Sequence, residues 1–202
     1  MPIPRNFRWL LRERWVRLLY FVAVGLGYIM VEIAFIQRFV LFLGHPTYAL
    51  TVVVFLLLLS SGAGSLASRR CLGKSGSAWL PLTVIIAALL LYVFILPGLL
   101  NALVGVVFIA KLLISVVLLV PLGFAMGMPF PTGLRALAGG PATASENSVE
   151  WAWAMNAASS VLGSVLAMVI AIEFGLNITL VCGAGAYLLA LMLTKTLQLQ
   201  QA

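Results

Sequence analysis

Four charged side chains lie inside runs that are otherwise apolar enough to cross a membrane, and any chemistry of this chain would depend on them. They are Glu32, Arg38, Lys111 and Glu173. A Glu or Arg at membrane depth costs about 2.5–3.5 kcal/mol on insertion scales and usually faces a protein interior or a cavity. These side chains therefore indicate either a site or an assembly surface.

Depth along the helices predicts which of these charges pair. At about 1.5 Å of rise per residue, Glu32 lies about 21 Å from the inner end of its span. Lys111 lies about 17 Å from the same side for a hydrocarbon core of about 30 Å. We therefore predict a Glu32–Lys111 pair that orients the first and fourth spans, because an unpaired buried charge is costly. The alternatives are a protonated, hydrogen-bonded Glu32 and unrelated partners in another subunit.

Arg38 and Glu173 each lie at the outward end of a span, which predicts a second charge pair near the outer boundary of the membrane. The alternative for Arg38 is that its side chain snorkels to water or to lipid headgroups.

Two spans carry small and polar residues at helical spacing. They are Gly25, Tyr28 and Glu32 on the first span, and Asn156, Ser160 and Gly163 on the fifth. Residues three and four apart share one face of a helix. We expect close helix packing, with one hydrogen bond between helices from Asn156, and a substrate-binding groove is the alternative. The inner end of the second span, Ser60–Ser65, is also rich in small residues that allow close approach.

The chain offers few metal ligands. His45 is the only histidine, and Cys71 and Cys182 are the only cysteines, so the chain contains no four-ligand zinc or iron–sulfur set. His45 precedes Pro46 in an expected turn, where a lone histidine is more often a hydrogen-bonding turn residue than a ligand of a metal or a pigment. We therefore expect no metal, no cofactor and no catalytic motif in this chain, and leave room for lipid or pigment on its flanks.

Composition indicates the class of protein that must position these residues. Of 202 residues, 63% are hydrophobic and 8% are charged, which excludes an ordinary soluble surface. A spanning helix needs about 20 apolar residues. We predict an all-α polytopic bundle over residues 18–195, with six spans at about 18–42, 48–66, 79–97, 102–127, 151–174 and 177–194. Residues 127–150 are expected to form the longest loop, and 196–202 a tail.

The distribution of basic residues predicts the orientation. Five arginines lie within residues 1–17, which we interpret as an amphipathic interfacial segment that contacts anionic lipid. The basic residues outside the spans would all lie on one side, so both termini are expected in the cytoplasm. The net charge of +7 thus has a membrane explanation, and no basic and aromatic groove indicates nucleic-acid binding.

Residues 25–50 resemble the membrane part of bacterial spermidine-synthase-like integral membrane proteins, also described as methyltransferase homologues. Further stretches carry the resemblance over most of the chain: Leu59–Ser65, Gly127–Arg135 and Trp151–Ser164. The matching individual residues are Glu32, Gln37, Arg38, His45, Pro46, Arg135, Trp153 and Asn156. The resemblance implies a multi-pass protein of the bacterial cytoplasmic membrane.

Such relatives also carry an aminopropyltransferase-like Rossmann domain, whose glycine-rich loop and amine-binding acids have no counterpart in these 202 residues. We therefore expect a non-enzymatic subunit that anchors or scaffolds a membrane assembly with other membrane subunits. One alternative is a permease-like module for an amine or similar small molecule. Another is the membrane half of an enzyme whose soluble Rossmann partner is separate and docks on residues 67–78 and 127–150.

Overall fold

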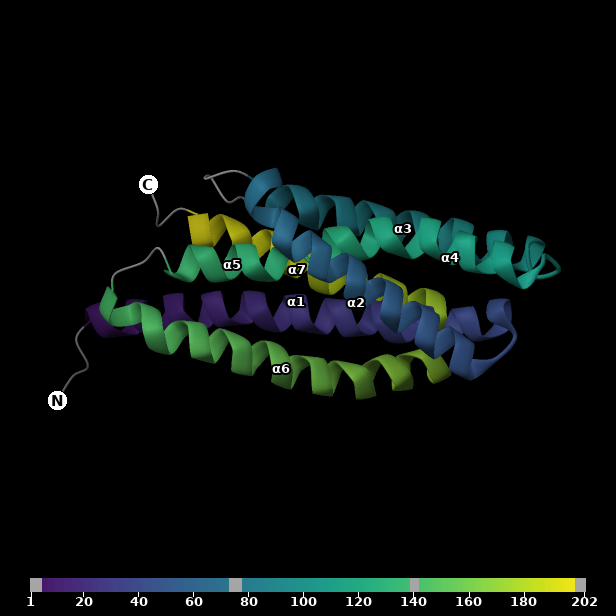
Figure 1. Cartoon of the computed structure of the whole chain (residues 1–202). Helices are drawn as coiled ribbons and strands as arrows, with labels where there is room; N and C mark the ends of the chain where they lie inside the picture. Colours follow the sequence, from purple (N-terminus) through teal and green to yellow (C-terminus); the bar gives the residue numbers. More distant parts are fainter. Residues whose placement is uncertain (1–4, 73–77, 139–141, 199–202) are drawn as a thin grey trace.

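The computed structural model describes residues 5–72, 78–138 and 142–198, and its secondary structure there is entirely helical (Figure 1). In chain order the helices are α1 (Arg5–Leu43), α2 (Pro46–Cys71), α3 (Trp79–Ala102), α4 (Phe108–Met126), α5 (Pro129–Ala138), α6 (Ala142–Glu173) and α7 (Leu176–Gln198). Six of these segments are long and apolar enough to cross a membrane. The predicted all-α bundle with six spans is confirmed.

Both termini lie at one end of the bundle in Figure 1, which we call the terminal end. The opposite end, which we call the Gly44 end, contains the turn between α1 and α2 and the turn between α6 and α7. Gly44 and Gly175 form these turns with φ of 83° and 89°. Glycine reaches such left-handed angles without the steric cost that a Cβ would bring, so both reversals can be abrupt.

Helix α1 is the centre of the bundle. In its apolar window 56% of the residues are buried, against 22–33% in the other five spans. It packs on α2, α6 and α7, while α3 and α4 lie side by side and contact α7 and α2 respectively (Figure 1). Buried residues on opposite sides of α1 explain this position, since Phe21 and Ala23 point about 160° apart around the helix and both are buried.

The basic N-terminal segment is not separate from the first span. Helix α1 runs without interruption from Arg5 to Leu43, 39 residues or about 58 Å, which exceeds the hydrocarbon core of about 30 Å. The helix therefore continues across the predicted boundary at residue 17, and the interfacial location of residues 1–17 remains a prediction. No helix breaker separates the arginines from the apolar run, so nothing in the sequence ends the helix there.

The long loop expected at 127–150 is mostly helical instead. Helix α5 begins at Pro129, because proline has no N–H to leave unpaired and its φ suits the first turn. One face of α5 is buried through Thr132, Gly133 and Leu137, and the Tyr20 hydroxyl donates to the Pro129 carbonyl oxygen at 2.8 Å. Helix α6 then begins at Ala142 rather than at Trp151, with residues 139–141 outside the described part.

The connection between α3 and α4 lies later in the chain than predicted. The predicted spans at 79–97 and 102–127 left residues 98–101 as a turn between helices, but α3 includes Pro97 and continues to Ala102. Helix α4 begins at Phe108, not at 102, so Lys111 lies in its first turn. A proline removes only one backbone donor, and near a helix end that loss does not stop the helix.

Glycines bring α2 and α4 into backbone contact. A Cβ built on Gly64 would strike the Phe124 carbonyl oxygen, and a Cβ on Gly127 would strike the carbonyl oxygen of Ser61. Small residues at a membrane helix interface permit this approach, and packing rather than hydrophobic burial then holds the helices together. The small-residue stretch of the second span therefore makes the close contact that its composition predicts.

Two buried tyrosines provide a test of hydrogen bonding in this core. Both side chains are fully buried, but the Tyr187 hydroxyl has no partner in the described structure, whereas the Tyr20 hydroxyl bonds Pro129. We predict that Tyr20→Phe lowers the free energy of unfolding by about 1 kcal/mol, the usual net value of one hydrogen bond. Tyr187→Phe should leave it unchanged or raise it. Titration with a denaturing detergent would measure both, and equal losses would contradict the assignment.

Candidate functional site

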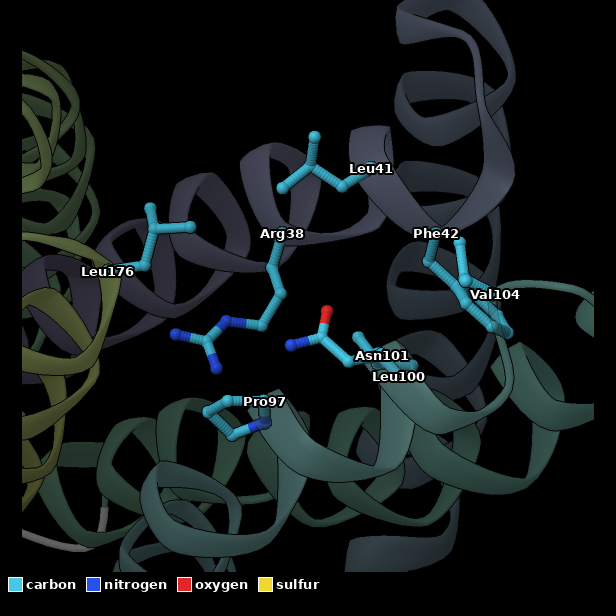
Figure 2. Close-up of a pocket in the computed structure, with 8 residues that line it drawn as sticks. All are labelled: Arg38, Leu41, Phe42, Pro97, Leu100, Asn101, Val104 and Leu176. Atoms are coloured by element: carbon cyan, nitrogen blue, oxygen red, sulfur yellow. The ribbon is translucent and has the colours of Figure 1, made fainter.

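A cavity of about 210 Å³ lies at the Gly44 end, between the end of α1, the end of α3 and the start of α7 (Figure 2). Its wall is largely apolar and contains one charged side chain. The lining residues are Arg38, Leu41, Phe42, Pro97, Leu100, Asn101, Val104 and Leu176. The site is therefore built where three chain segments that are distant in sequence end together.

The Arg38 guanidinium is the chemical centre of this cavity. Its Nη2 donates to Asn177 Oδ1 at 2.5 Å. Its Nε and Nη1 are buried and have no acceptor among the described residues. A guanidinium has five N–H donors in a fixed plane and stays charged, so the remaining donors can receive an oxygen-rich anion.

Asn101 adds a second polar group to the cavity. Its carboxamide points toward the Arg38 side chain in Figure 2, from the last turn of α3. Because α3 continues past Pro97, Asn101 is held on a helix and not in the turn that the sequence suggested. The site thus presents a fixed positive charge and an amide in a mainly apolar wall.

A second cation lies behind one wall of the cavity. The Lys111 Nζ is 5.6 Å from the ring centroid of Phe42, within the range of a cation–π contact. Phe42 itself lines the cavity. Arg38 and Lys111 therefore both bring positive charge to the part of the Gly44 end that contains Phe42.

The structure does not form the predicted Glu32–Lys111 pair. Lys111 lies at Phe42, ten residues or about 15 Å along α1 from Glu32. The depth estimate counted from residue 102, and it failed because α4 begins six residues later. Glu32 is half-buried and has no ion pair in the described part of the chain. The alternatives of a protonated Glu32 and of an external partner remain predictions.

The predicted Arg38–Glu173 pair is replaced by a neighbouring contact. Glu173 ends α6 and is exposed, while Asn177, in the first turn of α7, takes the Arg38 hydrogen bond. The turn at Gly175 reverses the chain between them, so it is Asn177 that reaches α1. The sequence analysis considered Arg38 and Glu173 and assigned no contact to Asn177. An amide just inside a span was the signal for its interaction.

The polar stripe of α6 packs on α1, as the packing interpretation predicts. The predicted hydrogen bond from Asn156 to another helix is wrong for the described residues, because the hydrogen bonds at Asn156 are made by its main-chain oxygen within α6. A Cβ on Gly25 would lie 2.7 Å from the Asn156 carbonyl oxygen and 2.8 Å from its Oδ1. A Cβ on Gly163 would meet Ile29 at 2.5 Å. The Ser160 hydroxyl bonds the Asn156 carbonyl oxygen at 2.9 Å, within its own helix. The backbone of α1 therefore fills the space beside this stripe.

Tyr28 differs from the other members of the predicted face. Its hydroxyl lies 3.4 Å from Ser61 Oγ, so it faces α2, whereas Gly25 faces α6. Two positions three residues apart on a helix are rotated by about 300°, so their side chains point about 60° apart. Because α1 is central, that difference is enough for the two side chains to face two neighbouring helices. The predicted shared face is thus divided between two interfaces.

His45 begins α2 and caps it. Its Nδ1 accepts from the Thr47 backbone N–H at 3.2 Å, and its ring lies 5.5 Å from that of Tyr48. The hydrogen-bonding turn role was expected from the sequence, and the structure adds that the partner is the backbone of Thr47. In the described residues no three His, Cys, Asp or Glu side chains are grouped so that they could hold a metal ion.

Arg135 makes a polar contact near the terminal end that the sequence did not assign. It donates through Nη1 to Ser68 Oγ and through Nη2 to Thr132 Oγ1, both at 3.0 Å. This contact joins α5 to the last turn of α2 and explains why α5 is held against the bundle. The sequence feature that could have indicated this contact is the arginine itself, which lies beside small residues in the segment predicted to be a loop.

Searches of protein families, curated proteins and solved structures gave no match to this chain. The structure establishes the fold, a helical bundle in which six helices of the described residues are long and apolar enough to cross a membrane.

Proposed function

We propose that this protein is a non-enzymatic subunit that anchors or scaffolds a larger assembly in the bacterial cytoplasmic membrane. One observation carries the proposal. The polar face most suited to a substrate, at Asn156, is covered by the α1 backbone, which approaches it closely at Gly25. A carrier would need an open cavity there, near the membrane midplane.

The packing of α1 supports a fixed rather than a rocking bundle. Gly25 and Gly163 allow α6 to approach α1, and Gly27 receives the Tyr187 ring of α7 with a Cβ-to-ring distance of 2.9 Å. Glycine contacts of this kind fix the distance between helices. A helix held this way on two sides is suited to a structural role.

The outer surface supplies the area that an assembly requires. Large apolar side chains project from the bundle, including Phe94 at 82% exposure on α3 and Ile172 at 72% on α6. Lipid covers such surfaces in any membrane protein, and neighbouring subunits can replace it. The resemblance of residues 25–50 to a membrane module that normally accompanies a larger protein supports the same proposal.

The test is isolation of the tagged full chain from its native membrane in mild detergent, followed by native mass spectrometry. We expect a complex with other membrane proteins in a fixed ratio, above the 21.7 kDa of the chain alone. A photo-crosslinking residue at Leu162, exposed on α6, should capture a subunit of that complex. The same residue at Ala167, buried on α6, is the matched control. A lone 21.7 kDa monomer without protein crosslinks would contradict the proposal.

A further inference from the structure

We propose that the cavity at Arg38 binds the phosphate group of an anionic membrane phospholipid from the leaflet at the Gly44 end. This site goes beyond the scaffold function, since it assigns a ligand to the chain itself. Its evidence is the guanidinium, the depth of the cavity and the nature of its walls.

The guanidinium supplies the specificity. Asn177 uses one donor on Nη2, and buried Nε and Nη1 have no protein acceptor among the described residues. A buried donor without a partner is unfavourable, and more so when it is charged. A phosphate oxygen would satisfy these donors through charge-assisted hydrogen bonds, for which arginine is well suited.

The depth of the cavity matches the headgroup region. Arg38 lies five residues, or about 8 Å, from the end of α1 at Leu43. Asn101 is next to the last residue of α3, and Leu176 is the first residue of α7. Headgroup and interfacial layers add about 5–7 Å on each side of the hydrocarbon core, so the ends of these helices reach the level of lipid phosphates.

The shape of the cavity favours part of a lipid over a free metabolite. Leu41 and Val104 line it and are 77% and 50% exposed, so the cavity opens toward the surroundings of the bundle. At about 210 Å³ it is smaller than the pockets of about 300–1,000 Å³ that enclose drug-sized ligands. It can therefore hold a headgroup while the acyl chains extend along the outer apolar surface.

Lys111 extends the positive field beyond the cavity. Its ammonium lies over Phe42, on the ring that forms one wall. Cations close to the membrane surface attract anionic lipid through long-range electrostatics. We therefore assign Lys111 to general attraction and Arg38 to the direct contact with phosphate.

The test uses the full chain in neutral detergent with native mass spectrometry and three probes: phosphatidylglycerol, diacylglycerol with the same acyl chains, and inorganic phosphate. Wild-type protein should bind phosphatidylglycerol at least tenfold more tightly than diacylglycerol. Arg38→Gln should weaken phosphatidylglycerol binding about tenfold. The matched control is Arg70→Gln, an exposed arginine in the last turn of α2, and it should change binding less than twofold.

A second variant keeps the test decisive if Arg38→Gln does not fold. Val104→Trp leaves the guanidinium intact, lies in the connection after α3 and fills the cavity, so it should also weaken phosphatidylglycerol binding about tenfold. Equal binding of phosphatidylglycerol and diacylglycerol, or unchanged binding in Val104→Trp, would overturn the proposal. Inorganic phosphate that competes at equal concentration would also overturn it, in favour of a soluble anion.

Discussion

Replacing Gly64 or Gly127 with alanine should lower the free energy of unfolding more than the other glycine-to-alanine substitutions considered for this chain. The new Cβ of Gly64→Ala meets the backbone of Phe124, with its carbonyl carbon 2.8 Å away, and that of Gly127→Ala meets the Ser61 backbone at 2.6 Å from its carbonyl carbon. Backbone cannot rotate aside as a side chain can. We expect each variant to lose about 3 kcal/mol, the upper end of the cost of overpacking.

Gly62 provides a control on the same helix. It lies two residues before Gly64 in α2, and a Cβ there meets no atom within 4 Å. Alanine in a helix interior is about 0.5–1 kcal/mol more favourable than glycine, so Gly62→Ala should be neutral or slightly stabilising. Gly62 and Gly64 thus differ in their contacts and not in helix propensity.

The measurement is the apparent melting temperature in mild detergent together with titration by a denaturing detergent. Gly64→Ala and Gly127→Ala should both unfold at lower detergent and at lower temperature than Gly62→Ala. Equal behaviour of Gly62→Ala and Gly64→Ala would show that α2 and α4 do not touch through their backbones, and the helix contact would have to be abandoned.

Composition and local pattern were sufficient to predict the spans and several contacts. The number of membrane segments follows from apolar length alone, and the small residues at Ser60–Ser65 and near Asn156 identify two helix interfaces. These features are local, since each depends on residues within one helix. Local features can be read without knowing which helices are neighbours.

The charge contacts were less predictable because they depend on where each helix begins. A shift of six residues in the start of α4 moves Lys111 about 9 Å along the helix axis, which accounts for most of the roughly 15 Å between Glu32 and Phe42. The α5 helix was missed for a related reason. Its prolines and glycine indicate a break in an isolated segment, whereas burial against Tyr20 and hydrogen bonds from Arg135 stabilise it in the fold.

The Arg38 cavity shows a third limit. An arginine near the end of a span indicates either a charge pair or snorkelling, and both concern a single side chain. The cavity arises from the end of α3 and the start of α7, which meet only in the folded chain. Asn177, the hydrogen-bond partner of Arg38, can be seen in the sequence as an amide at the start of a span. The sequence does not show that Asn177 lies next to Arg38 in the folded chain.

Gly25→Ala should separate α6 from α1 and is the second large effect expected. The added Cβ would lie 2.7 Å from the Asn156 carbonyl oxygen, and it would also strike the Ser159 hydroxyl. The hydroxyl can rotate, but the carbonyl belongs to the α6 backbone, so the helix must move. We expect a loss of about 2 kcal/mol in unfolding free energy.

Gly185→Ala on α7 is the matched control, because a Cβ there meets no atom within 4 Å and the substitution gains only helix propensity.

A cysteine pair at Ile29 and Gly163, one on each helix, would report the separation of α1 and α6, since a Cβ at Gly163 lies 2.5 Å from Ile29. In the Gly25→Ala background disulfide formation between them should slow, while Gly185→Ala should leave it unchanged. If Gly25→Ala were as stable as Gly185→Ala and crosslinked equally fast, α6 would not be closed on α1. The Asn156 stripe would then be open, and the carrier function would be favoured over the scaffold.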